Sequence, residues 1–174
     1  MMQMNRHASG CSRNAGFSLI EMMVVLCGAG IIAAMALPGL TNMQNNYNTV
    51  FAAQEIGTQL HFAKLKAISS NEALRVNFSN ATSYRVELSD GTLIRGPHNF
   101  PVGISLNTVD GGTGVTFGGS YVTFQPDGTV PVSGNGSMGR VKLISRNGLR
   151  VDILVDGGGL IRQTPPYKTS SAPF

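Results

Sequence analysis

The sequence has few charged side chains. Asp, Glu, Lys and Arg make up 13% of its 174 residues, about half the share that is usual in a soluble protein. The deficit is concentrated near the N-terminus, because Glu21 is the only charged residue between Arg13 and Glu55. The remainder of the chain has the composition of an ordinary small β-rich domain.

The sequence also lacks the motifs of common catalytic and metal sites. His61 and His98 have no Cys or second His nearby to form a metal site, and we expect surface or capping roles for both. Residues 111–114 are Gly-rich but lack the Lys-Ser/Thr of a phosphate-binding loop. We therefore expect no catalytic residue, no metal and no cofactor, and the chain is not expected to be an enzyme.

The N-terminal 40 residues contain a long apolar stretch behind a short basic one. Residues 1–15 are polar and carry Arg6 and Arg13, and every residue from 22 to 37 is apolar or Gly. Counted from Phe17 to residue 40, the segment has about 24 residues and would be roughly 36 Å long as a helix. That length crosses the hydrocarbon core of a bilayer. The basic start should stay cytoplasmic, which places the C-terminal domain on the other side.

Three kinds of targeting segment fit this pattern. One is a secretory signal peptide cleaved after residues 34–36, Ala-Met-Ala, and another is an uncleaved signal anchor. The third is a prepilin-type signal, which is cut at the Gly16–Phe17 bond and keeps the apolar helix. Glu21 favours the third, because a carboxylate in an apolar span costs roughly 2.5–3.5 kcal/mol near its centre, and less near its end. In a filament, that carboxylate could neutralise the new amino group of Phe17 on a neighbouring subunit.

Residues 16–26, Gly-Phe-Ser-Leu-Ile-Glu-Met-Met-Val-Val-Leu, resemble the N-terminal motif of type IV pilins and pseudopilins. The resemblance implies that Gly16 precedes the cut of prepilin peptidase and that Phe17 becomes the N-methylated N-terminus. It also implies that Glu21 acts in filament assembly and that Pro38 bends the helix. The expected partners are the peptidase, major and minor pilins or pseudopilins, and lipid of the inner membrane, which the chain would cross once with its C-terminal domain periplasmic.

Removal of residues 1–16 changes the charge and the cysteine content. Without Arg6 and Arg13, 11 of the 13 Lys and Arg remain against 9 Asp and Glu, a formal charge of +2, which is a weak argument for nucleic acid. Cys11 would leave with the leader and Cys27 lies in the apolar run. The mature chain would then have no internal disulfide.

Beyond Pro38 the hydrophobic period predicts first a helix and then strands. Apolar residues recur at three- and four-residue steps and predict one stripe that packs on the domain: Leu40, Met43, Tyr47, Val50, Ala53, Ile56, Leu60, Ala63 and Ala67. The helix should end near Asn71. A period of two then predicts roughly eight strands: 74–78, 84–88, 92–95, 121–125, 129–132, 140–145, 149–155 and 160–163. Residues 107–120 are expected to form a loop.

The C-terminal part resembles a subgroup of the family. The helix end at residues 59–71, the Phe-x-Pro-x-Gly hairpin in residues 122–128 and the turn at residues 145–148 are similar to those of the H-type minor pseudopilins, the GspH/FimT group. Some members of that group bind DNA through a Gly-Arg-x-Arg sequence, where this chain has Gly-Leu-Ile-Arg at residues 159–162. Arg162, with Arg150 and Arg146, could make only a weak DNA contact, so nucleic acid is not expected as a partner. If the chain did bind nucleic acid, these three residues together with Arg140 and Lys142 would form the patch.

The sequence therefore predicts an α+β chain, with a long N-terminal helix packed on an antiparallel β-sheet domain. We expect a leader at 1–16, a membrane or filament-core helix at 17–40 and an amphipathic continuation at 41–71. A β-rich domain at 72–163 and a disordered tail at 164–174 follow. The resemblance implies a minor pseudopilin that initiates or caps the pseudopilus of a type II secretion system. The alternative is a FimT-like minor type IV pilin in pilus biogenesis or DNA uptake.

Overall fold

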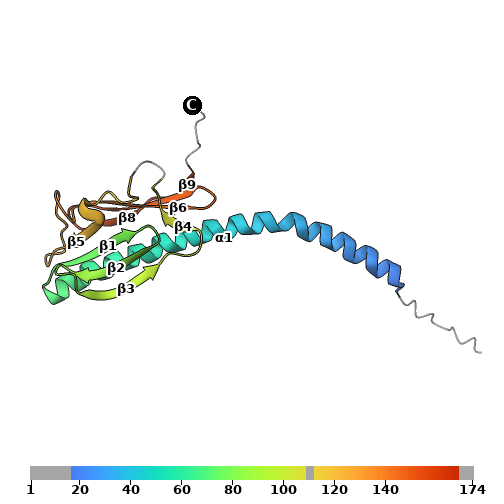
Figure 1. The fold of residues 1–174 in the computed structure, drawn as a ribbon, viewed down its shortest axis with the longest axis horizontal. Helices are drawn as coiled ribbons and strands as arrows, with labels where there is room; N and C mark the ends of the chain where they lie inside the picture. The colour runs from blue at the N-terminus through green and yellow to red at the C-terminus, as the bar shows by residue number, and fades with distance from the viewer. Residues whose placement is uncertain (1–16, 109–111, 169–174) are drawn as a thin grey trace, which may run out of the picture. The chain divides into compact units, whose positions relative to one another are not determined.

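A single long helix leads into the domain. The computed structural model describes residues 17–108 and 112–168, so Gly16 and the rest of the expected leader lie outside the described residues. Helix α1 spans Leu19–Ser70 and continues through Pro38 (Figure 1), while the bend expected there stays a prediction. The chain divides into two compact units, residues 1–40 and 41–174, which are described separately.

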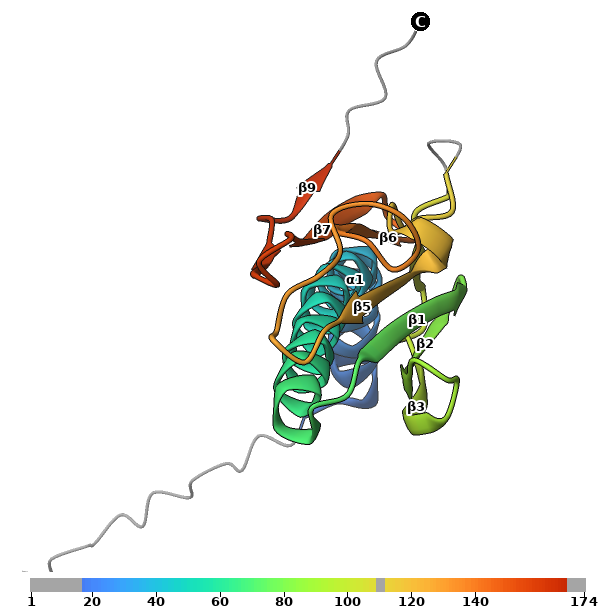
Figure 2. The ribbon, with the colours of Figure 1, turned by 90° about the vertical axis from the view of Figure 1, so that its left-hand side faces the viewer.

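The second unit contains two antiparallel sheets. One sheet has the order β3-β2-β1-β5, and the other has the order β4-β6-β7-β8 with β9 also paired to β7. The strands are β1 Leu74–Asn80, β2 Ser83–Leu88, β3 Leu93–Asn99, β4 Ile104–Leu106, β5 Tyr121–Phe124, β6 Gly139–Ser145, β7 Leu149–Val155, β8 Ile161–Gln163 and β9 Tyr167–Lys168. The two sheets lie along different sides of the second half of α1 (Figure 2), which confirms the predicted fold class.

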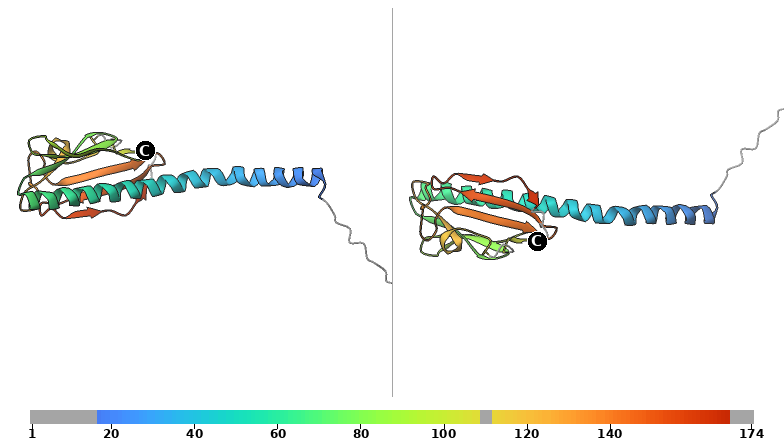
Figure 3. Two further views of the ribbon diagram at one scale, coloured as in Figure 1. Left: turned by 90° about the horizontal axis from the view of Figure 1, so that it is seen from below. Right: turned by 90° about the horizontal axis from the view of Figure 1, so that it is seen from above.

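The core lies between the second half of α1 and the inner faces of both sheets, whose strands run alongside the helix (Figure 3). The helix contributes Ile56 and Leu60, both fully buried, together with four buried alanines. The small alanines let the strands approach the helix closely while Ile56 and Leu60 fill the larger spaces, which is how a core reaches crystal-like density.

The predicted helical stripe is correct only in its second part. Ala53, Ile56, Leu60, Ala63 and Ala67 are buried, and Val50 is half-buried. The earlier members, Leu40, Met43 and Tyr47, are exposed, so their prediction is wrong. Full burial on α1 begins at Thr49. Just before it, the domain meets α1 through half-buried polar side chains such as Asn46, which accepts a hydrogen bond from the Asn147 amide.

Several strand predictions are also corrected. Residues 129–132 form no strand: Val130 donates one hydrogen bond to Gly157 O, and Pro131 has no N–H to continue a ladder. Strand β3 runs past Pro97 to Asn99, and so includes His98, since an edge strand tolerates a missing donor. The sequence pattern does not predict β4, whose three residues were too few to show a period, although Ile104 and Leu106 are core residues.

The start of the expected disordered tail is ordered. Thr164 N–H donates to the backbone oxygen of Asp152, and Asp152 N–H donates to the Thr164 hydroxyl oxygen. Strand β9 pairs with β7 at Arg150 and Leu149. The tail prediction is therefore wrong for residues 164–168. Pro165 and Pro166 lie in the short connection between β8 and β9, and both of these strands pair with β7.

Candidate functional site

Helix α1 begins with a local cap that includes the carboxylate singled out in the sequence. The N–H of Glu21 donates to Ser18 Oγ over 3.3 Å, and Glu21 is the acidic residue of the first turn. Ser and Glu three residues apart form the spacing of a capping box, and a negative charge at a helix N-terminus is stabilised by the helix dipole. Glu21 therefore has a local role in starting the helix, which the sequence reasoning missed although the spacing contains the signal.

The first unit exposes apolar side chains all around the helix. An 18-residue stretch of α1 has a mean hydropathy of 2.3 and none of it is buried. Phe17 is 74% exposed, and the described side chains that follow it up to Leu40 are all exposed, including Cys27. By length and composition this part of the helix can cross a membrane. A surface of this kind is stable only against lipid or against other protein.

A second candidate region is the outer face of the five-stranded sheet. The register pairs Leu154 with Arg140 on one side and with Arg162 on the other, and residues directly opposite in antiparallel strands share a face. Lys142 faces Asp152 in the next row, and Arg150 lies one row further. Four basic side chains from three strands therefore gather on one side of the sheet. We call this set the basic sheet face: Arg140, Lys142, Arg150 and Arg162.

Of the residues predicted to make a weak DNA contact, Arg150 and Arg162 thus lie on the basic sheet face. Arg146 lies instead in the turn between β6 and β7, where its N–H donates to Gly103 O. Asp152 is the one acidic residue on the face, and it is 5% exposed. It accepts a hydrogen bond from the Tyr167 hydroxyl at 3.1 Å and lies 3.6 Å from Arg140 Nη1.

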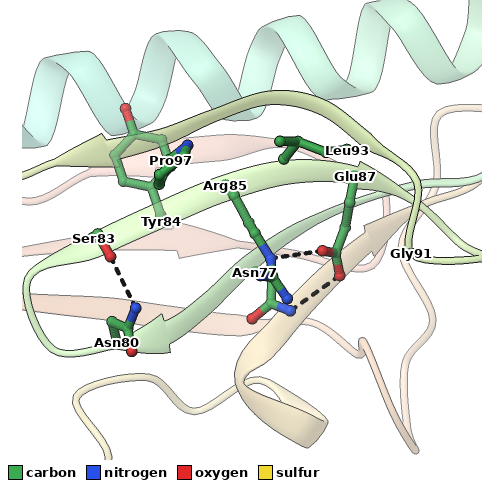
Figure 4. A pocket seen from close by; sticks show the side chains of 9 residues that line it. All are labelled: Asn77, Asn80, Ser83, Tyr84, Arg85, Glu87, Gly91, Leu93 and Pro97. Carbon is green, nitrogen blue, oxygen red and sulfur yellow. Dashed lines mark hydrogen bonds and ion pairs between the residues drawn. The ribbon is translucent and has the colours of Figure 1, made fainter.

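The outer face of the other sheet carries a hollow of 290 Å³ between β1, β2 and β3 (Figure 4). Its most buried charge is Glu87, whose carboxylate contacts Arg85 Nε at 2.8 Å, Arg75 Nε at 3.4 Å and the amide of Asn77 at 3.0 Å. These partners occupy lone pairs of the two carboxylate oxygens and tie neighbouring strands of the sheet together.

A small polar cluster of Tyr84, Glu55 and His98 joins α1 to the β2–β3 hairpin. The Tyr84 hydroxyl donates to Glu55 Oε1 at 3.2 Å, and His98 stacks on the Tyr84 ring at 5.3 Å. Burial, followed by the nearby Glu55 charge, raises the pKa of Tyr84 far above its usual value. His98 is thus a half-buried stacking residue on β3, whereas His61 is exposed on α1. Among residues 17–108 and 112–168, no group of three or more His, Cys, Asp or Glu could hold a metal ion.

Lys64 fastens α1 to the turn at residues 156–159. Its Nζ donates to Gly159 O at 2.9 Å and to Gly158 O at 3.4 Å. Gly159 has a φ of +68°, and a Cβ there would collide with the carbonyl oxygen of Gly128. Only glycine fits, because the backbone is left-handed and another chain segment approaches it directly. The predicted hairpin at residues 122–128 and the turn before Arg162 are thus packed against each other.

The fold is found in two solved structures of filament proteins. The type IV minor pilin FimU of Pseudomonas aeruginosa is 15% identical, with a TM-score of 0.51 over 69% of this chain and 90% of that one. The minor pseudopilin EpsH from the type 2 secretion system of Vibrio cholerae is 11% identical, with a TM-score of 0.51 over 67% of this chain and 96% of that one. At these identities the likeness concerns the fold alone.

Comparison at the level of sequence families gives a more specific result. No curated protein matches the sequence at a significant level. A family model described as type II transport protein GspH matches residues 52–159, which is more than half of the 174 residues. The matched residues begin in the buried part of α1 and end at the Gly159 turn. This chain therefore belongs to the GspH family, in agreement with the resemblance noted in its sequence.

Proposed function

We propose that this protein is a minor pseudopilin, a structural subunit that initiates or caps the pseudopilus of a type II secretion system. The proposal rests on the combination of a GspH domain with an apolar helix that precedes it. The described side chains of that apolar stretch are all exposed, and its first turn carries one carboxylate. Such a helix needs lipid or other subunits around it. In this proposal it first anchors the chain in the inner membrane, with the domain in the periplasm, and then enters the filament.

The proposed maturation involves the N-terminus. Prepilin peptidase hydrolyses the Gly16–Phe17 bond, and the free amino group of Phe17 is then methylated. The cation so created lies four residues before the carboxylate of Glu21. Inside a filament, the amine of one subunit and Glu21 of its neighbour neutralise each other. Leaving either charge buried without its partner would cost several kcal/mol.

Glu21→Gln tests the assembly role, because it removes the charge and keeps both the side-chain length and the Ser18 cap. We expect membrane insertion and cleavage after Gly16 to continue, and the amount of the protein in sheared filaments to fall at least about tenfold. Glu72→Gln is the matched control, since Glu72 is an exposed carboxylate just beyond the other end of α1. Normal incorporation of the Glu21 variant would rule out the proposed role of this residue.

The N-terminus itself is tested by intact mass and N-terminal sequencing of protein from membranes of cells that have the peptidase. A chain that starts at Phe17 and is one methyl group heavier supports the prepilin maturation. A chain that starts at Leu37 contradicts it, because ordinary signal peptidase would then have removed Glu21 together with the helix.

The alternative is a FimT-like minor type IV pilin, which the same fold accommodates. Deletion of the gene separates the two machines. Loss of protein secretion with intact pili supports the secretion system, whereas loss of pili or of DNA uptake with normal secretion supports the alternative.

A further inference from the structure

The charge of the mature chain is distributed unevenly along its length. Residues 139–168 hold six Lys and Arg and two Asp, a formal net charge of +4, whereas residues 17–138 hold five Lys and Arg and seven Asp and Glu, a net charge of −2. The excess is therefore confined to the strands β6–β9 and their turns. Four of the six basic residues make up the basic sheet face.

The basic sheet face also has apolar positions between its charges. Leu154 lies between Arg140 and Arg162, and Ile144 lies directly opposite Arg150. Leu154 and Ile144 are both half-buried, so each leaves part of its surface in water. Arginine around a small apolar centre is the composition found at protein–protein interfaces.

We propose that the basic sheet face docks an acidic surface of a different subunit in the same filament. This inference rests on the proposed function, which supplies the neighbouring subunit. Asp152 is buried and ion-paired with Arg140, so it neutralises one of the four basic side chains and leaves the face with three positive charges in excess. The remaining positive charge attracts a partner with exposed Asp and Glu, and charge pairs at such a surface set the rate and specificity of docking.

A second copy of this chain does not offer a matching surface. The acidic residues in its described strands are Glu87 and Asp152, and both are buried against arginines. In the described turns the acidic residues lie singly. Asp90, Asp127 and Asp156 each accept a hydrogen bond within their own turn, and Glu72 stands alone beyond the end of α1. The partner is therefore a chain of different sequence.

A protein fits this face better than a nucleic acid. Binding to a phosphate backbone gains affinity from each basic residue that meets a phosphate, but the middle row of this face pairs Lys142 with a carboxylate, that of Asp152. The half-buried Leu154 and Ile144 would gain nothing from phosphates, whereas they can be covered by the side chains of a protein.

Charge reversal on the full-length chain in detergent micelles tests the proposal. The probes are the other prepilin-like subunits of the same system, each produced separately, and a short DNA duplex. We expect one acidic subunit to bind, with a dissociation constant that rises at least about tenfold for Arg162→Glu. Lys66→Glu is the matched control, because it makes the same charge change at an exposed position of α1 and should leave binding within about twofold. Raising the salt from about 0.1 M to about 1 M shortens the Debye length from about 10 to about 3 Å and should weaken the wild-type complex.

A charge swap separates a specific contact from misfolding. Arg162→Glu should keep the unfolding midpoint of the wild type, and an Asp or Glu to Arg change on the partner should restore part of its binding. Three results would overturn the inference. The Arg162→Glu and Lys66→Glu variants could bind the subunit equally well, the chain could associate only with itself, or Arg162→Glu could weaken binding of the DNA duplex while no subunit binds. If Glu21→Gln still blocks incorporation in any of these cases, the proposed function stands without the inference; if it does not, the proposed function fails on its own test.

Discussion

The two halves of α1 differ in what surrounds them, although they form one continuous helix. In residues 19–40 the described side chains are all exposed and nearly all apolar, whereas in residues 49–67 one face is fully buried under strands of the same chain. Apolar surface that stays in water costs about 25 cal/mol per Å². The second half buries its apolar face within its own domain. The first half can bury its apolar side chains only in lipid or among other subunits.

The difference also explains how each half tolerates charge. The second half keeps Glu55 and Lys64 at the edges of its buried face, each with a hydrogen-bond partner in the domain. The first half has Glu21 alone, at its N-terminal end, where the helix dipole and the Ser18 cap lower its cost. Stability measurements on equivalent substitutions in the two halves test this difference.

The largest difference is expected for Leu60→Ala against Leu26→Ala. Leu60 is fully buried and Leu26 is 70% exposed, so the first change leaves a cavity and the second does not. We expect the free energy of unfolding of the domain to fall by about 2–5 kcal/mol for Leu60→Ala and to stay unchanged for Leu26→Ala. Urea titration of the chain in detergent, followed by circular dichroism, measures both. Equal effects would mean that the domain also depends on contacts of the first half.

A smaller loss is expected for Tyr84→Phe, which removes the hydrogen bond that ties β2 to Glu55 of α1. Below pH about 10 the variant should be less stable than the wild type by about 0.5–1.5 kcal/mol. Burial raises the pKa of Tyr84 in the folded state, so its contribution is complete below the unfolded pKa of about 10 and is lost as the pH rises towards the folded pKa. The gap between the two proteins should therefore narrow above pH about 10. A gap that stays constant up to pH about 11 would contradict the buried, hydrogen-bonded hydroxyl.

The smallest effect, with the opposite sign, is expected for Gly57→Ala. Gly57 lies inside the second half of α1, and a Cβ there would meet no atom within 4 Å. Alanine should stabilise the domain by about 0.5–1 kcal/mol, because it lowers the entropy lost when the helix forms. Gly28→Ala, equally open in the first half, should leave domain unfolding unchanged in the same urea titrations. A loss of stability for Gly57→Ala would indicate a packing contact that the structure does not contain.

Local patterns in the sequence are sufficient to predict the helix, the strands and the family. A long apolar run with one early carboxylate predicts the exposed helix, and a change of period from 3.6 to two near residue 72 predicts the step from helix to strands. The resemblance at residues 59–71 and 122–128 was sufficient to indicate the family. The cap formed by Ser18 and Glu21 was equally local, and its spacing could have been recognised.

Which of these residues contact one another depends on the folded chain and cannot be predicted from local patterns. Period alone could not show that Leu40, Met43 and Tyr47 would stay exposed, because burial depends on which residues of the helix the folded domain covers. Nor could it bring Arg140 and Arg162, 22 positions apart in the sequence, onto one face, since that follows from the register of three strands. Periodicity is a property of neighbouring residues, whereas register, burial and shared faces arise from contacts between distant ones, and those exist only once the chain has folded.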